Sequence, residues 1–176
     1  MAAPIASDCY APLQHRSSAL VEHCRQLVSR NDLNWLPHFG FWAMPLSGDW
    51  IEKEPALSAA HAICPIIQLG ILQMPDHWVY HWHCDENRQA CINMLISTNH
   101  HSHTLFGRSI SNANMHSLEL CYEPGCFYLF NNQVPHTVIN LDVNRYLFSL
   151  EFSQPLSFAE LKERFGSAGI LADDAP

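Results

Sequence analysis

The sequence predicts a mainly β fold, a double-stranded β-helix or jelly roll, with flanking α-helices. Eight short apolar stretches between residues 66 and 152 are separated by Gly, Pro and Asn residues, which is the pattern of strands and turns. Eight strands at this spacing suit a double-sheet jelly roll. Nine Phe, five Tyr and five Trp residues supply the aromatic content of a β-rich core.

The first 65 residues are expected to be mainly helical. Two prolines and few apolar residues in 1–16 indicate an irregular lead-in. Residues 17–31 have apolar side chains at helical spacing and a serine at the start that can cap the helix. Residues 35–47 are aromatic and interrupted by proline, which indicates a covering strand or loop. Residues 54–63 predict a short helix with Pro55 in its first turn.

The β-core follows, with strands expected over 66–73, 77–83, 90–97, 103–108, 115–122, 126–130, 136–141 and 145–152. Side chains alternate between the two faces of a strand. In the last strand, Arg145, Leu147, Ser149 and Glu151 therefore share one face, and Tyr146, Phe148, Leu150 and Phe152 share the other. An arginine that opens so apolar a strand is costly to bury without a partner.

A closing helix is expected over residues 157–165, because Ser157 and Glu160 have the spacing of a capping box. The tail 166–176 is small and acidic, and we expect it to be mobile. A length of 176 residues fits one domain. We divide it into a helical N-terminal part (about 1–65), a β-core (about 66–152) and a C-terminal helix and tail (153–176).

Composition excludes several classes of function. A net charge of −8 disfavours binding to nucleic acid and to anionic membrane surfaces. No apolar run is long enough for a membrane span, and the N-terminus lacks the basic and apolar regions of a secretory signal. Seven cysteines, an odd number without a C-x-x-C pair, fit reduced thiols in the cytoplasm better than a disulfide framework. The oligomeric state is left open.

Three residues have the types and order of a metal site. His83 and Asp85 are two residues apart, so on one strand they would point to the same face, and Cys84 would pack on the other. His136 from a distant strand would complete three ligands around one ion. Two histidines and a carboxylate are the facial triad of non-haem Fe(II) oxygenases. Arg145 follows His136 by nine residues, which suits a return to the neighbouring strand and places a bidentate carboxylate clamp beside the metal.

The segments "HCDENRQACINMLI" and "PGCFYLFNNQVPHTVINLDVNRYLFSLEF" resemble the Fe(II)/2-oxoglutarate-dependent oxygenases. More narrowly, they resemble the aspartyl/asparaginyl β-hydroxylase-like or proline-hydroxylase-like branch of that superfamily. The resemblance covers roughly residues 66–152. It implies that His83, Asp85 and His136 hold Fe(II) and that Arg145 pairs with the far carboxylate of the cosubstrate 2-oxoglutarate. The implied reaction uses O2, hydroxylates a C–H bond and releases succinate and CO2, with ascorbate as an expected stimulant.

Further residues follow from the same resemblance. Relatives carry Ser or Thr two residues after the arginine, where this chain has Leu147. Ser149, Thr104 and Tyr128 are the remaining candidates for that hydroxyl. Asn93 matches an Asn of a family strand, and it would either contact 2-oxoglutarate or tie neighbouring backbone.

Two alternatives from other classes stay open. His81, His83 and Glu86 approximate a cupin motif, which would make the protein a metalloenzyme that does not use 2-oxoglutarate. A non-catalytic jelly-roll binding module would leave the histidines incidental. Arg145 argues against the cupin alternative, because a cupin has no defined role for this arginine. A structural salt bridge with an acidic neighbour would also explain Arg145.

The substrate implied by the resemblance is an amino acid, free or within a peptide, and thus a small molecule or a peptide. The pocket is expected to be walled by Trp78 or Tyr80, His81, Asn93 and Thr104. Arg88 would either contact a substrate carboxylate or be a solvated loop charge.

Overall fold

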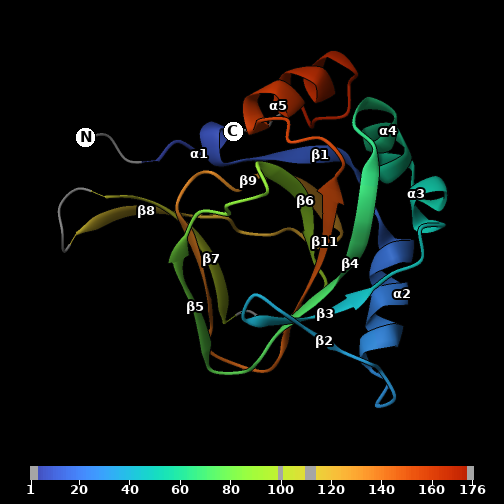
Figure 1. The fold of residues 1–176 in the computed structure, drawn as a ribbon, viewed down its shortest axis with the longest axis vertical. Coiled ribbons are helices and arrows are strands. Elements are labelled where there is room, and N and C mark those ends of the chain that lie inside the picture. Colours follow the sequence, from blue (N-terminus) through green and yellow to red (C-terminus); the bar gives the residue numbers. More distant parts are fainter. Residues whose placement is uncertain (1–3, 99–100, 110–113, 174–176) are drawn as a thin grey trace.

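The computed structural model describes residues 4–98, 101–109 and 114–173, and its core consists of two antiparallel sheets that face each other (Figure 1). In pairing order, the larger sheet contains β1 (Tyr10–Arg16), β9 (Cys126–Asn131), β6 (Ala90–Leu95), β11 (Arg145–Phe152), β4 (Ile66–Met74), β3 (Phe41–Pro45) and β2 (Leu36–His38). The smaller sheet contains β5 (Trp78–His83), β10 (His136–Asn140), β7 (Ser102–Ser109) and β8 (Met115–Glu119). This is the predicted jelly roll, and β4 to β11 match the expected strands to within three residues at each end.

The expectation of an irregular lead-in over residues 1–16 is wrong. A single-turn helix, α1 (Ala6–Cys9), is followed directly by β1, which pairs with β9 at the edge of the larger sheet. An edge position tolerates Pro12, because one side of the strand needs no ladder hydrogen bonds. Residues 35–47 form the β2–β3 hairpin, so the N-terminal part contains three strands besides its helices.

The predicted helices are present as α2 (Ser18–Val28), α4 (Pro55–Ile63) and α5 (Phe158–Ser167), and a further short helix, α3 (Trp50–Lys53), was not predicted. The capping box of α5 is formed as expected, with Ser157 and Glu160 bonded reciprocally. No helix in the described ranges is long and apolar enough to cross a membrane. Of the tail, residues 174–176 lie outside the described residues.

The alternation in β11 divides the protein into a packed side and an open side. Phe148, Leu150 and Phe152 belong to the main hydrophobic core, where the larger sheet packs against α2, α4 and α5. In Figure 1, α2, α3 and α4 lie beside β4 on the side of the larger sheet away from the smaller sheet. The other face of β11 points into the space between the sheets. A second apolar cluster, centred on Phe106 and Phe130, fills only part of that space, and a cavity occupies another part.

Candidate functional site

A cavity of about 440 Å³ lies between the two sheets and contains most of the predicted site residues. Its lining includes the expected metal ligands and cosubstrate-binding residues His83, Asp85, Asn93, Thr104, His136, Arg145 and Ser149. Of these seven residues, those on the larger sheet lie on β6 and β11, and those on the smaller sheet lie on β5, β7 and β10. The fold therefore brings together residues that are up to 66 positions apart in the chain, from His83 to Ser149.

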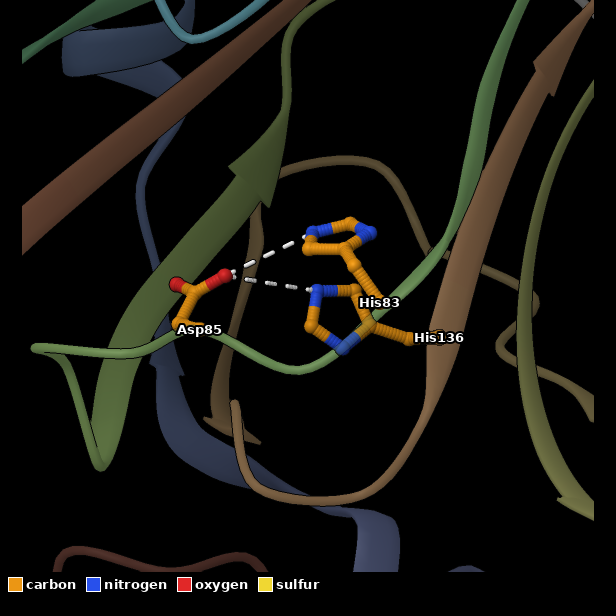
Figure 2. Close-up of side chains that lie close together, drawn as sticks. All are labelled: His83, Asp85 and His136. Atoms are coloured by element: carbon orange, nitrogen blue, oxygen red, sulfur yellow. Dashed lines mark ion pairs between the residues drawn. The ribbon is translucent and has the colours of Figure 1, made fainter.

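The three expected metal ligands lie close to one another (Figure 2). His83 ends β5 and His136 begins β10, and the two are direct partners across these antiparallel strands. Asp85 lies two residues beyond the end of β5, so the expectation that it shares a strand face with His83 is wrong in detail. One ligand atom from each residue nevertheless lies within 4.8 Å of the others, and this is the one such cluster found among the described residues.

The ring orientations of both histidines are fixed by backbone carbonyls. Nδ1 of His83 is 2.7 Å from the carbonyl oxygen of His81, and Nδ1 of His136 is 2.9 Å from that of Val134. A carbonyl only accepts hydrogen bonds, so each Nδ1 carries a proton and donates it, and each Nε2 is left to face the site. The two Nε2 atoms face Oδ1 of Asp85 at 3.4 and 3.8 Å. This is the arrangement in which metal-binding histidines are held.

The protonation states of His136 and Asp85 also suit a divalent cation. Burial lowers the pKa of His136 to about 4, so its ring is neutral at neutral pH. Burial opposes ionisation of Asp85, but its hydrogen bond with His83 and the nearby charges of Arg88 and His136 outweigh burial and lower its pKa to about 2. A neutral imidazole and an ionised carboxylate are the forms that bind metal.

Arg145 is 2% exposed, and it lines the cavity. Its Nη2 donates to Oγ1 of Thr104 at 3.1 Å, and its guanidinium lies 5.8 Å from the ring centre of Tyr122. Within the described ranges it forms no ion pair with a carboxylate, and its Nε has no hydrogen-bond partner. The described residues therefore do not place Arg145 in a structural salt bridge. An anion from outside the chain could neutralise its buried charge.

Of the hydroxyl candidates beside Arg145, only Thr104 contacts it. Ser149 lines the same cavity but accepts a hydrogen bond from Arg88, and Tyr128 bonds the backbone of Glu123 instead. Asn93 is buried at the cavity wall, and its Oδ1 has no partner among the described residues.

Tyr122 is the residue that the sequence interpretation missed. Its hydroxyl interacts with Thr104 and Arg145, and burial raises its pKa to about 12, so it stays protonated. It lies in the irregular segment between β8 and β9, where no periodic pattern indicates which way a side chain points.

The expected substrate-facing wall is only partly correct. Tyr80 lines the cavity, whereas Trp78 and His81 are exposed and do not. The cause is a register shift between β10 and β5: His136 pairs with His83, but Val138 pairs with Tyr80. The extra residue in β5 reverses the alternation, so His81 does not share the face of His83.

The β2–β3 hairpin supplies the rest of the wall, which the sequence did not predict. His38, Phe39 and Phe41 line the cavity. Phe41 packs against Tyr80 with ring centres 4.5 Å apart, and Tyr80 packs against His83 at 4.3 Å. Aromatic rings therefore lead from the hairpin to the histidine pair.

Comparison with protein-family models and with curated proteins gives no match for this chain. Solved structures do match. The fold is shared with 2-oxoglutarate–Fe(II) oxygenases. An oxidoreductase of the 2OG-Fe(II) oxygenase family from Burkholderia pseudomallei is 9% identical, with a TM-score of 0.58 over 80% of this chain and 81% of that one. At such identity the likeness is one of fold.

Two other matches are similar in extent. A prolyl hydroxylase from Trichoplax adhaerens, in complex with a hypoxia inducible factor peptide fragment, is 12% identical, with a TM-score of 0.59 over 89% of this chain and 87% of that one. HygX from Streptomyces hygroscopicus, with nickel, 2-oxoglutarate and hygromycin B bound, is 12% identical, with a TM-score of 0.56 over 77% of this chain and 78% of that one.

Proposed function

We propose that this protein is an Fe(II)- and 2-oxoglutarate-dependent dioxygenase that hydroxylates an amino acid, free or within a peptide. The observation that carries the proposal is a single cavity that is lined by metal-donor residues on one side and by a buried arginine on another. One wall presents His83, Asp85 and His136 as a cluster of metal donors, and another presents Arg145, a buried cation without an anionic partner among the described residues.

The donor set fits Fe(II). Two imidazole nitrogens and one carboxylate oxygen bind a transition metal and leave further positions for other ligands, which is the donor set of non-haem Fe(II) oxygenases. No thiolate is needed, and Cys84 does not supply one. Its Sγ lies 3.3 Å from the carbonyl oxygen of Gln133, and burial raises the pKa of the thiol.

The surroundings of Arg145 fit the far carboxylate of 2-oxoglutarate. Thr104 and Tyr122 orient the guanidinium, and a carboxylate would satisfy a buried charge that has no carboxylate partner among the described residues. Asn93 and Ser149, which line the same cavity, are proposed as further cosubstrate contacts. In a cupin that does not use 2-oxoglutarate, the buried Arg145 would have no ligand to bind.

In this proposal, His83, Asp85 and His136 hold the metal and Arg145 orients the cosubstrate. The aromatic side chains of the hairpin limit the access of water. When bound, Fe(II) with 2-oxoglutarate and O2 supplies the oxidising chemistry that hydroxylates a C–H bond, with release of succinate and CO2. The chain contributes binding, orientation and a shielded cavity.

The substrate proposal rests on the wall that faces the open part of the cavity. Phe39, Phe41 and Tyr80 offer apolar contact, and Glu86 and Glu151 offer carboxylates. This mixture suits an amphipathic molecule of amino-acid size or a peptide side chain. The β-hydroxylase-like or proline-hydroxylase-like branch and a cytoplasmic location, both expected from the sequence, belong to this proposal.

The test is a turnover assay for succinate with Fe(II), ascorbate and 2-oxoglutarate, across free amino acids and short peptides. We expect slow succinate release without substrate and stimulation by at least one member of the set. Arg145→Ala should abolish both at ordinary 2-oxoglutarate concentration while the protein still binds metal. Absence of any 2-oxoglutarate-dependent succinate from metal-loaded wild-type protein would contradict the proposal. Omission of ascorbate should reduce the number of turnovers rather than prevent the first.

A further inference from the structure

The two carboxylate oxygens of Asp85 have different surroundings. Oδ2 accepts hydrogen bonds from Nε of Arg88 at 3.0 Å and from Nδ2 of Asn132 at 2.7 Å. Oδ1 faces the Nε2 atoms of His83 and His136 instead (Figure 2). Oδ2 is therefore engaged in hydrogen bonds within the protein, and Oδ1 points between the two histidine rings.

The backbone around Asp85 is held by the turn that precedes His136. The Asp85 N–H donates to the carbonyl oxygen of Asn132 at 3.0 Å, and Nε2 of Gln133 donates to the carbonyl oxygens of Asp85 at 2.9 Å and Arg88 at 3.1 Å. Asp85 needs these contacts because it lies beyond the end of β5, where no strand ladder fixes it. The same turn thus positions two of the three metal-donor residues.

Arg88 is itself fixed to the larger sheet. Its Nη1 donates to Oγ of Ser149 at 3.2 Å, on β11, the strand that begins with Arg145. Its side chain is 27% exposed, so it is not the solvated loop charge considered from the sequence. Both Nε and Nη1 are used within the protein, which leaves less of the guanidinium for a substrate carboxylate.

We propose that Arg88 and Asn132 are positioning residues that hold Asp85 so that Oδ1 alone is offered to the metal. This inference rests on the proposed metal site. A carboxylate that can turn freely is able to present both oxygens to a cation. The second oxygen would then take a coordination position that the cosubstrate needs. Arg88 and Asn132 prevent this by keeping Oδ2 in two hydrogen bonds.

The test measures Co(II) binding to the metal-free protein by calorimetry, which requires no turnover. Arg88→Met and Asn132→Ala should each weaken Co(II) binding about 10- to 100-fold, the usual effect of losing a partner of a metal ligand. Arg88→Lys should recover part of the affinity, because an ammonium group cannot make both contacts in the same geometry. Arg30→Met, which removes the arginine of an exposed ion pair with Asp32, should bind Co(II) like the wild type.

A double-mutant cycle separates positioning from general support of the fold. If Arg88 acts through Asp85, then Arg88→Met should have no further effect on the residual Co(II) affinity in an Asp85→Ala background, measured at Co(II) concentrations high enough for the two histidines to bind the ion. A purely structural role would weaken binding equally in both backgrounds and would overturn the inference. The visible absorption of bound Co(II) gives a second readout, since its intensity and position should differ between wild type and Arg88→Met if the carboxylate changes its mode of binding.

The outcomes distinguish this inference from the proposed function. If Asp85→Ala weakens Co(II) binding but Arg88→Met and Asn132→Ala do not, the positioning role is wrong and the metal site stands. If the wild type binds no Co(II) and no Fe(II), both fail. Should Arg88→Met not fold, as judged by circular dichroism, Arg88→Lys and Asn132→Ala decide the question by the same measurement.

Discussion

His83 and His136 stand directly opposite each other on neighbouring antiparallel strands, with their ring centres 4.2 Å apart. The pairing of β5 with β10 alone is therefore enough to bring two metal donors together. Neighbouring side chains in such a pair are within contact distance by the geometry of the sheet. The third donor, Asp85, depends on a loop and its hydrogen bonds.

The first prediction concerns metal binding. His83→Ala and His136→Ala should each reduce Fe(II) occupancy from about one ion per chain to near zero, because two remaining donors hold the ion poorly. The measurement is iron content after anaerobic loading and gel filtration. His116→Ala, a change in an exposed histidine of β8, is the control and should keep full occupancy. Full occupancy in both His83→Ala and His136→Ala would show that the site lies elsewhere.

The second prediction concerns the stability cost of Arg145. Without cosubstrate this cation is buried and has no anionic partner among the described residues, so Arg145→Met should stabilise the metal-free protein by on the order of 1–4 kcal/mol in urea unfolding. With Mn(II) already present, adding 2-oxoglutarate should stabilise the wild type further but not the variant, because only the wild type binds the cosubstrate tightly.

The matched control for Arg145 is Arg25→Met. The Arg25 guanidinium donates to the carbonyl oxygen of Ile96 at 3.1 Å, so its removal should bring no gain in stability and leave the response to 2-oxoglutarate intact. Calorimetry should place the loss of 2-oxoglutarate affinity in Arg145→Ala at about 2–5 kcal/mol, as for other buried charge pairs. An unchanged affinity would remove Arg145 from the site.

The third prediction concerns Tyr122. Its hydroxyl interacts with Thr104 and Arg145, so Tyr122→Phe should weaken 2-oxoglutarate binding by about 0.5–1.5 kcal/mol, less than the loss of Arg145 itself. Tyr128→Phe removes a buried hydroxyl that bonds the Glu123 backbone, from a residue that does not line the cavity. Calorimetry should find wild-type affinity in Tyr128→Phe, and equal losses in the two variants would contradict the assigned role.

The fourth prediction concerns the tip of the β2–β3 hairpin. Phe39 has a φ of 44° and is followed by Gly40 with a φ of 85°, a pair of positive values that suits Asn-Gly far better than Phe-Gly. Phe39 is also 78% exposed while lining the cavity. Phe39→Asn should therefore stabilise the fold by roughly 1 kcal/mol and raise the KM for the substrate that stimulates succinate release.

The control for Phe39 is His77→Asn, which relieves a positive φ of 50° at an exposed position outside the cavity. It should stabilise the protein without changing the KM. If Phe39→Asn leaves the KM of the stimulating substrate unchanged, the ring at the hairpin tip has no part in recognition.

The β-core was predictable because its signals are local. Strand-forming and turn-forming residues alternate through residues 66–152, and the spacing of Ser157 and Glu160 predicts the capping box of α5. The metal-donor cluster was predictable for a related reason: residue types and order restrict the chemistry even before the pairing is known. These parts need no knowledge of distant contacts.

The remaining features depend on contacts that one sequence does not display. Strand β1 forms because β9 offers it an edge, and the one-residue shift in β5 that turns His81 outward appears only when β5 is paired with β10. The role of Arg88 depends on Ser149, which is 61 residues away. Tyr122 lies outside any regular element, so its direction is set by packing alone.

Strand β5 is an edge strand of the smaller sheet, paired with β10 alone among the described strands, and it ends in a metal donor. An edge strand held from one side opens locally more easily than a central one. Metal shared between His83 and His136 would fasten that edge, so amide hydrogens of β5 should exchange with solvent more slowly once the ion is bound. The supply of iron would then govern the lifetime of the protein against proteases as well as its chemistry.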